Sequence, residues 1–269
     1  MLKNITLGQY FPGDSFIHRL DPRTKLLLTI ALIVIVFLSK GFAGFAVIAA
    51  FVLFAALSTG IHLKFLFRGL KPLLFIIVFT FFLNLFFQSE GNVLFRFHIL
   101  KITDLGLRTA SFMALRLIML IICSQLLTLT TSPISLTDGL ESLFRPLEVF
   151  HFPAQEIAMM MSIALRFIPT LMDEADKIMK AQKARGANFE TGNIVARAKA
   201  MVPLLVPLFV GAFRRAEDLA LAMDARCYRG GAARTRMKKL AFGYRDLIAA
   251  FAVILLLAAV ILLNAVSNF

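Results

Sequence analysis

The sequence predicts an all-α membrane protein with about five transmembrane helices, and three observations support this fold class. Hydrophobic residues make up 59% of the 269 residues, and the mean hydropathy of +0.82 is too high for a single soluble core. The apolar residues gather in runs of roughly 20, the length that a helix needs to cross about 30 Å of hydrocarbon. Elsewhere the pattern is helical, with little strand alternation.

Five apolar runs are the candidate spans. They cover residues 24–38, 42–59, 72–88, 109–131 and 247–266. The first run is short, and only three residues separate it from the second. An alternative is therefore that these two runs form one long kinked helix.

The distribution of positive charge orients the spans. The formal net charge is +13, and basic residues flank the first two runs. They are Lys3, Arg19, Arg23 and Lys25 before the first run, and Lys64, Arg68 and Lys71 in the loop after the second. Because Lys and Arg near span ends resist translocation, both flanks are predicted to be cytoplasmic. We therefore expect residues 89–108 outside, 132–245 inside and the C-terminus outside. Contact with acidic lipid is a second interpretation of the charge, and nucleic acid is disfavoured.

The chain is expected to have three parts. These are residues 1–131, with the N-terminal tail and four spans; 132–245, with cytoplasmic helices; and 246–269, with the last span. In the middle part, Ser135 is expected to cap a short helix and Pro153 to open a longer one that ends at Gly186. Pro203 and Pro207 are expected to kink or delay the next helix, so we place its start near residue 208.

A short basic element occurs twice in the middle part. The two copies are Ala184-Arg185-Gly186 and Ala225-Arg226-Cys227, with 41 positions between the arginines, and alanines and acids upstream match at the same offset. An arginine at a helix end presents a planar fork suited to a carboxylate on a partner. The alternative is that each arginine only complements the helix dipole, worth about 0.3–1 kcal/mol. Repetition of the neighbouring alanines favours a surface for two similar partners.

Other candidate residues have structural explanations that are at least as good. Arg116 lies within the fourth span, where an ionisable side chain suggests function, although pairing with a backbone carbonyl is the stronger interpretation. Arg166, before Pro169, is expected to anchor a turn or to pair with Glu156 or Asp173. The thioethers of Met159, Met160 and Met161 suit either an adaptable docking surface or an ordinary core.

Three passages resemble one known family. They are Gly8-Gln9-Tyr10 with His18 to Lys25, Ala164-Leu165-Arg166-Phe167-Ile168-Pro169, and the paired Ala-Arg elements. Together they resemble the transmembrane T component of energy-coupling factor transporters, ABC importers of vitamins and transition metals, of the type shared among substrate-binding subunits. Cys227 departs from the family pattern, in which glycine is common.

The resemblance implies a scaffold in a bacterial cytoplasmic membrane. Its partners would be two cytoplasmic ATPases, which dock on residues 184–186 and 225–227, and a membrane-embedded substrate-binding subunit. No G-x-x-x-x-G-K-[ST] loop is present, so we expect no ATPase site and no cofactor in this chain, with ATP bound by the partners. Two alternatives remain: a secondary transporter that uses Arg116, Asn84 and Gln125 as a path, and a membrane enzyme, which the lack of a catalytic constellation disfavours.

Overall fold

The computed structural model describes residues 10–87, 93–97, 100–150, 152–187, 189, 193–228, 230 and 240–267. The chain divides into two compact units. One combines residues 8–139 with 240–269 and is called the bundle here; the other comprises residues 140–239 and is called the paired-helix unit. The three-part division expected from the sequence stays a prediction.

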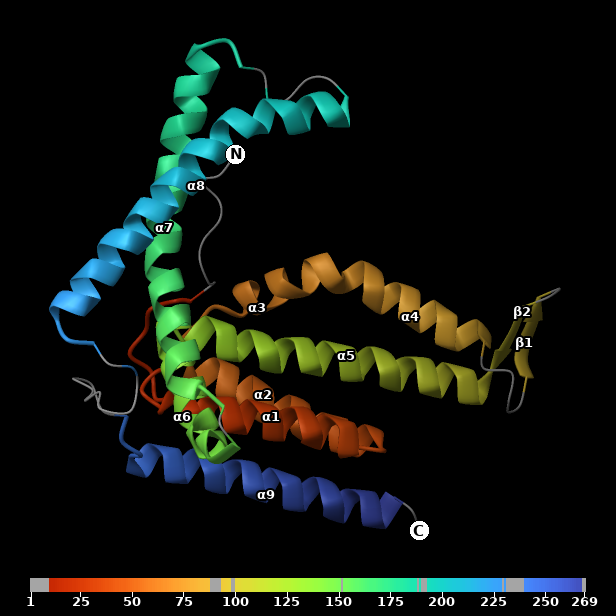
Figure 1. Cartoon of the computed structure of the whole chain (residues 1–269). Coiled ribbons are helices and arrows are strands. Elements are labelled where there is room, and N and C mark those ends of the chain that lie inside the picture. The colour runs from red at the N-terminus through yellow and green to blue at the C-terminus, as the bar shows by residue number, and fades with distance from the viewer. Residues whose placement is uncertain are drawn as a thin grey trace. The chain divides into compact units, whose positions relative to one another are not determined.

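Long apolar helices form the bundle (Figure 1). Its helices are α1 (Pro22–Leu38), α2 (Phe42–Ser58), α3 (Leu63–Leu70), the 3₁₀ helix η2 (Lys71–Leu73), α4 (Leu74–Phe87), α5 (Asp104–Thr130) and α9 (Tyr244–Ser267). Among the residues that the structure describes, three segments are long and apolar enough to cross a membrane: Lys64–Phe87, Asp104–Thr130 and Tyr244–Val266. Phe42–Ser58 is a shorter apolar helix. The predicted fold class, an all-α membrane protein, is confirmed, while the count of five spans stays a prediction.

Helices α1 and α9 run in the same direction. The Asp21 backbone N–H, at the start of α1, donates to the carboxylate of Asp246 in the first turn of α9, at 2.9 Å. Near the other end, the Asn264 side chain donates to the Leu38 carbonyl at 2.8 Å and accepts from the Lys40 N–H at 3.1 Å. Polar contacts therefore fix the register of these two helices at both ends.

Helices α1 and α2 run in opposite directions. Lys25, at the start of α1, donates to the carbonyl of Thr130 at the end of α5, so α1 runs opposite to α5. Phe42, at the start of α2, stacks on Phe112, in the first part of α5, so α2 runs along α5. The alternative of one long kinked helix is therefore wrong, because extended residues at Ser39 and Gly41 reverse the chain.

The segment after α2 is helical, although the sequence suggested a loop. Helix α3 continues through η2 into α4, and the basic side chains of Lys64, Arg68 and Lys71 are exposed along it. Pro72 does not end the segment because it occupies the first turn of η2, where its missing N–H costs little. The third apolar segment consequently begins at Lys64 rather than near Pro72.

A two-stranded antiparallel hairpin connects α4 and α5 and was not expected. Strand β1 (Val93–Phe97) pairs with β2 (Leu100–Thr103) from Phe97 opposite Leu100 to Val93 opposite Thr103, with a bulge between Val93 and Phe95. Thr103 then caps α5, because its hydroxyl accepts the Gly106 N–H at 3.0 Å.

The bundle core is small relative to its apolar surface. Buried side chains from α1, α2, α5 and α9 form one cluster, comprising Ile35, Val36, Phe45, Ile48, Val52, Cys123, Val253, Leu256 and Val260. Large apolar side chains are exposed on the outside, as with Phe75 at 76% and Leu247 at 75%. Helices that are apolar all round, with no aqueous face, are typical of a membrane interior.

Two helices dominate the paired-helix unit: α7 (Ala154–Ala184) and α8 (Ile194–Ala225). Helix α6 (Pro133–Phe144), of which residues 133–139 belong to the bundle, and the 3₁₀ helix η3 (Arg145–Phe150) precede them along the chain. Helix α8 begins at Ile194, so the start expected near residue 208 is wrong. Pro203 and Pro207 lie inside α8 on its exposed side, four residues apart, so their missing backbone bonds fall on one stripe of the helix.

Ser132 caps α6, in place of the expected Ser135. The Ser132 hydroxyl accepts the Ser135 N–H at 3.2 Å, and Pro133 occupies the first helical position. Proline suits that position because the N–H that it lacks would have no partner in the helix. The cap therefore falls on the residue before the proline.

Asp246 links the starts of α1 and α9, and its removal should destabilise the bundle. The buried carboxylate accepts N–H groups from both Asp21 and Gly243, so Asp246→Ala leaves two donors without their acceptor. We expect the free energy of unfolding to fall by about 1–3 kcal/mol. Denaturation of the purified chain in detergent measures this change.

Asp104→Ala is the matched control, because Asp104 also lies in the first turn of its helix but is exposed. Its loss should cost only the dipole contribution, about 0.3–1 kcal/mol. Equal destabilisation by the two substitutions would contradict the linking role of Asp246.

Candidate functional site: two matched helix ends

Helix α7 ends in a Schellman motif, in which two backbone bonds close the last turn. The Gly186 N–H donates to the Lys183 carbonyl at 3.0 Å, and the Ala187 N–H donates to the Gln182 carbonyl at 2.9 Å. Gly186 has a φ of +89°, in the left-handed region that this motif requires. Arg185 is the C-cap residue between the helix and this turn.

Helix α8 ends in the same motif. The Cys227 N–H donates to the Asp224 carbonyl at 2.9 Å, and the Tyr228 N–H donates to the Met223 carbonyl at 3.1 Å. Each bond is the counterpart of one in α7, shifted by 41 positions. Cys227 has a φ of +55° and so adopts the left-handed backbone without being a glycine. The repeat in the sequence is thus also a repeat in backbone geometry.

Both arginines occupy the same place in these motifs. Arg185 and Arg226 each follow the last helical residue, an alanine, and precede the left-handed residue. Both side chains are exposed, and neither makes an ion pair with any residue that the structure describes. Each guanidinium is therefore free to pair with a group from outside the chain. The docking role stays a prediction.

The helices α7 and α8 pack against each other (Figure 1). Glu174 on α7 and Arg215 on α8 form an ion pair, and both side chains are about 30% exposed. Neither residue was singled out in the sequence, although they are also 41 positions apart. The repeat offset was the one signal that could have found them.

The methionines and the arginine–proline element lie on α7. Met160 and Met161 are 59% and 41% exposed, while Met159 is partly buried. Arg166 is exposed and makes no ion pair with a described residue, so the pairing suggested with Glu156 or Asp173 is wrong. Pro169 lies inside α7, which continues through it.

An exposed apolar strip on α8 was also missed. Its seven side chains follow two rows with a spacing of four, and each is at least 44% exposed. They are Met201, Val202, Leu205, Val206, Phe209, Val210 and Phe213. Such a contiguous strip marks a contact surface for protein or lipid. The signal in the sequence was the spacing, which the two prolines obscured.

The polar residues suggested as a transport path contact backbone carbonyls instead. Arg116 Nη2 donates to the Ser39 carbonyl at 3.4 Å, where α1 ends, and its guanidinium lies 5.5 Å from the centre of the Phe37 ring. Asn84 and Gln125 donate to carbonyls at 2.9 and 3.0 Å. Each of these side chains is thus hydrogen-bonded to the backbone within the bundle.

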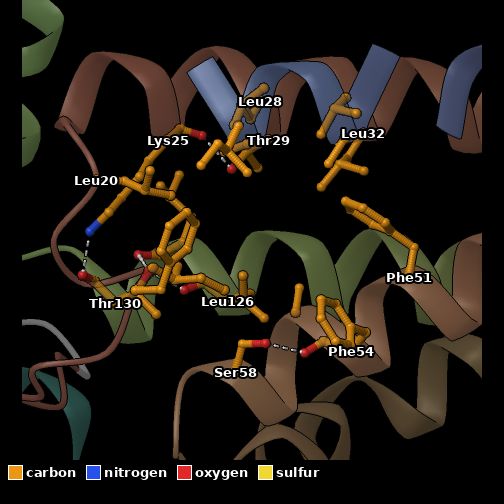
Figure 2. Close-up of a pocket in the computed structure, with 18 residues that line it drawn as sticks. Leu20, Lys25, Leu28, Thr29, Leu32, Phe51, Phe54, Ser58, Leu126 and Thr130 are labelled. Carbon is orange, nitrogen blue, oxygen red and sulfur yellow. Dashed lines mark hydrogen bonds between the residues drawn. The ribbon is translucent and has the colours of Figure 1, made fainter. Parts of the chain in front are cut away.

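The bundle also contains an apolar cavity of about 190 Å³ (Figure 2). Leu28, Leu32, Phe51 and Leu126 line it, and Lys25 lies at one edge. Lys25 Nζ donates to the Thr130 carbonyl at 2.8 Å rather than to an occupant of the cavity. The described residues contain no group of three or more His, Cys, Asp or Glu that could hold a metal.

The fold and the paired helix ends define a helical membrane protein with two helix ends of matching geometry, each carrying an exposed arginine. Residues 13–238 match the family model CbiQ, described as cobalt transport protein. The energy-coupling factor transporter transmembrane protein EcfT of Thermosediminibacter oceani is 59% identical over 248 residues, 92% of this chain and 93% of the relative. Those of Clostridium kluyveri and Bacillus subtilis are 52% identical over 263 residues and 46% over 265. The alignment with the Clostridium kluyveri protein covers 97% of this chain and 97% of the relative. The alignment with the Bacillus subtilis protein covers 98% of this chain and 100% of the relative. The chain therefore belongs to the family of transmembrane proteins of energy-coupling factor transporters, and the resemblance noted in the sequence is confirmed.

The left-handed residues predict opposite effects of two substitutions. Cys227→Gly should stabilise the chain by about 1 kcal/mol, because glycine adopts a positive φ without steric cost. Gly186→Ala should destabilise it by a similar ~1 kcal/mol, through strain alone, since no atom lies within 4 Å of the added Cβ. Thermal unfolding of the purified chain measures both changes.

Cys227→Ala serves as the control, because alanine keeps the strain and removes only the thiol. If it stabilised the chain as much as glycine does, the gain would come from loss of the thiol and not from the backbone.

Proposed function

We propose that this chain is the transmembrane energy-coupling subunit of an ATP-driven importer of vitamins or other micronutrients. It would join two cytoplasmic ATPases to a membrane-embedded substrate-binding subunit. The observation that carries the proposal is the pair of matched helix ends, each presenting an exposed arginine. The relatives named as transmembrane proteins of energy-coupling factor transporters support the same role.

The chemistry of docking follows from the guanidinium group. Arg185 and Arg226 each offer a planar fork of N–H donors, which pairs with a carboxylate through two parallel hydrogen bonds. Two copies of one ATPase would present two copies of one acidic groove. Two equivalent arginines on one chain match such a pair, and one asymmetric chain can thereby bridge a symmetric partner.

In this role the chain transmits movement and carries out no chemistry. Closure of the ATPases around ATP would bring their grooves together and carry the helix ends with them. Rigid helices α7 and α8 would pass that displacement to the substrate-binding subunit. The exposed strip on α8, together with Met160 and Met161, is the surface proposed for that contact. ATP would be bound by the ATPases alone, and no cofactor is needed in this chain.

A stand-alone secondary transporter is less well supported. That function needs polar groups free to bind an ion or substrate within the bundle. Arg116, Asn84 and Gln125 each donate to a backbone carbonyl, at Ser39, Thr80 and Phe65 respectively. Arg116 Nε and Gln125 Oε1 are buried without a hydrogen-bond partner, but these contacts still hold both side chains against neighbouring helices. Their positions are explained by the fold.

The proposed setting is a bacterial cytoplasmic membrane, with the N-terminus and the paired-helix unit inside. In intact cells, a cysteine at Lys64 should react only with membrane-permeant thiol reagents, and one at Lys40 should also react with impermeant ones. Both side chains are exposed, so orientation rather than burial decides the outcome. Labelling uses a Cys227→Gly background, which removes the exposed native thiol.

A cysteine at Lys180, on α7, extends this test to the paired-helix unit. It is exposed and should be protected like the one at Lys64. Impermeant labelling at Lys180 would place α7 outside, where no cytoplasmic ATPase could reach it.

Substitution of the two arginines tests the docking role. Arg185→Ala or Arg226→Ala should weaken capture of the ATPases by tagged chain, with a loss of roughly 2–5 kcal/mol if the partner carboxylate is buried. In each single variant the remaining arginine still tethers the complex. The double variant has no docking arginine left and should lose capture almost entirely. Lysine at either position keeps the charge without the fork and should restore capture only in part.

Arg214→Ala is the control, since Arg214 is exposed on α8 but lies away from the helix end. ATP hydrolysis should appear only when the ATPases are present. If the double variant captured the ATPases as well as the wild type does, the arginines would only complement the helix dipoles. The proposed function would then lose its main support.

A further inference from the structure

Glu174 on α7 and Arg215 on α8 are in contact, and a glycine next to them makes room for this contact. The two side chains form an ion pair and are about 30% exposed. Gly211, one turn before Arg215, faces the same carboxylate: a Cβ there would lie 3.0 Å from Glu174 Oε1. The absence of a side chain at Gly211 therefore leaves room for the Glu174 carboxylate between the helices.

The partners in this ion pair are equivalent residues of the repeat. Glu174 and Arg215 are 41 positions apart, the same offset that relates Arg185 to Arg226 and each backbone bond of the two Schellman motifs. A two-fold axis between two similar helices brings equivalent residues together where it passes between them. Residues 41 positions apart are called repeat mates here. Contact between two repeat mates is therefore the arrangement that approximate two-fold symmetry requires.

Each helix continues from the ion pair to its terminal arginine, and we call these two segments, residues 174–185 and 215–226, the arms. The two arms are equal in length. From Glu174 to Arg185 is 11 residues, and from Arg215 to Arg226 is also 11. At 1.5 Å per residue, each arm extends about 16 Å beyond the contact. With the arm lengths equal and both ends closed by the same motif, the angle between the helices decides how far apart the arginines lie.

We propose that Glu174 and Arg215 are a positioning pair that sets the separation of the two docking arginines. The proposal rests on the proposed function, in which the spacing of the arginines has to match the spacing of two ATPase grooves. The ion pair holds the helices together at one point, and a small change of angle there moves both ends. Charge-assisted bonds are directional, so they constrain the angle more than apolar contact at the same point would.

The geometric part of the test uses the full-length chain in lipid nanodiscs without ATPases. Spin labels are placed at Lys180 and Leu221, which are repeat mates, exposed, and six residues beyond the ion pair in each arm. The chain carries Cys227→Gly so that only these sites react; the remaining Cys123 is buried. Pulsed electron resonance then reports the distribution of distances between the arms.

Glu174→Ala and Arg215→Ala should each broaden and shift this distribution. Alanine is a strong helix former, so the helices themselves should persist. The charge-reversed double variant, Glu174→Arg with Arg215→Glu, should narrow the distribution again. Asp173→Ala and Arg214→Ala, at the neighbouring exposed positions, should leave it unchanged. An unchanged distribution in the single variants would overturn the proposal, as would broadening that charge reversal fails to correct.

The functional part of the test measures capture of the ATPases by tagged chain. Each single alanine variant should reduce capture by about three- to tenfold, and charge reversal should recover it. Full capture by chains with a broadened distribution would also overturn the proposal. The two ideas fail separately. If the Arg185→Ala, Arg226→Ala double variant keeps full capture, the proposed function fails; if only the Glu174 and Arg215 variants have no effect, the positioning pair fails alone.

Discussion

Backbone carbonyls at the ends and breaks of the membrane helices are the groups on which the bundle depends. In hydrocarbon an unpaired carbonyl costs several kcal/mol, so each one exposed where a helix stops needs a donor. Lys25 supplies a donor at the end of α5, and Arg116 and Asn264 supply donors at the end of α1. Each of these donors lies on a different helix from its acceptor. Because such bonds join specific residues, they set the direction and register of helices whose apolar faces would pack in several ways.

In the paired-helix unit, one chain presents two helix ends of equivalent geometry. Schellman motifs give both helices the same stop, and the arginine takes the same position in each. Cys227 holds a left-handed backbone that glycine would adopt at lower cost. The motif at the end of α8 therefore forms despite the steric cost of a non-glycine residue at its left-handed position.

Much of the fold was predictable from composition, because long apolar runs have few other structures available in a membrane. Errors arose where two local signals competed. Pro203 and Pro207 suggested a helix start but lie within α8, whose packing on α7 outweighs their cost. The serine cap of α6 is Ser132, three residues earlier than the predicted Ser135. The basic residues of α3 and η2, Lys64, Arg68 and Lys71, suggested a loop, although basic residues on an exposed helix satisfy the same charge rule.

By itself the sequence determined the fold class, the family and the repeated arginine element, because each of these depends on the order of residues along the chain. Tertiary structure alone decided which residues meet. Asp21 bonds to Asp246 across 225 positions, and Glu174 pairs with Arg215 across 41. Helical periodicity states which side chains share a face, but not which face of another helix lies opposite. That choice depends on the packing of whole helices, and it converts a repeat in the sequence into two arms of equal length.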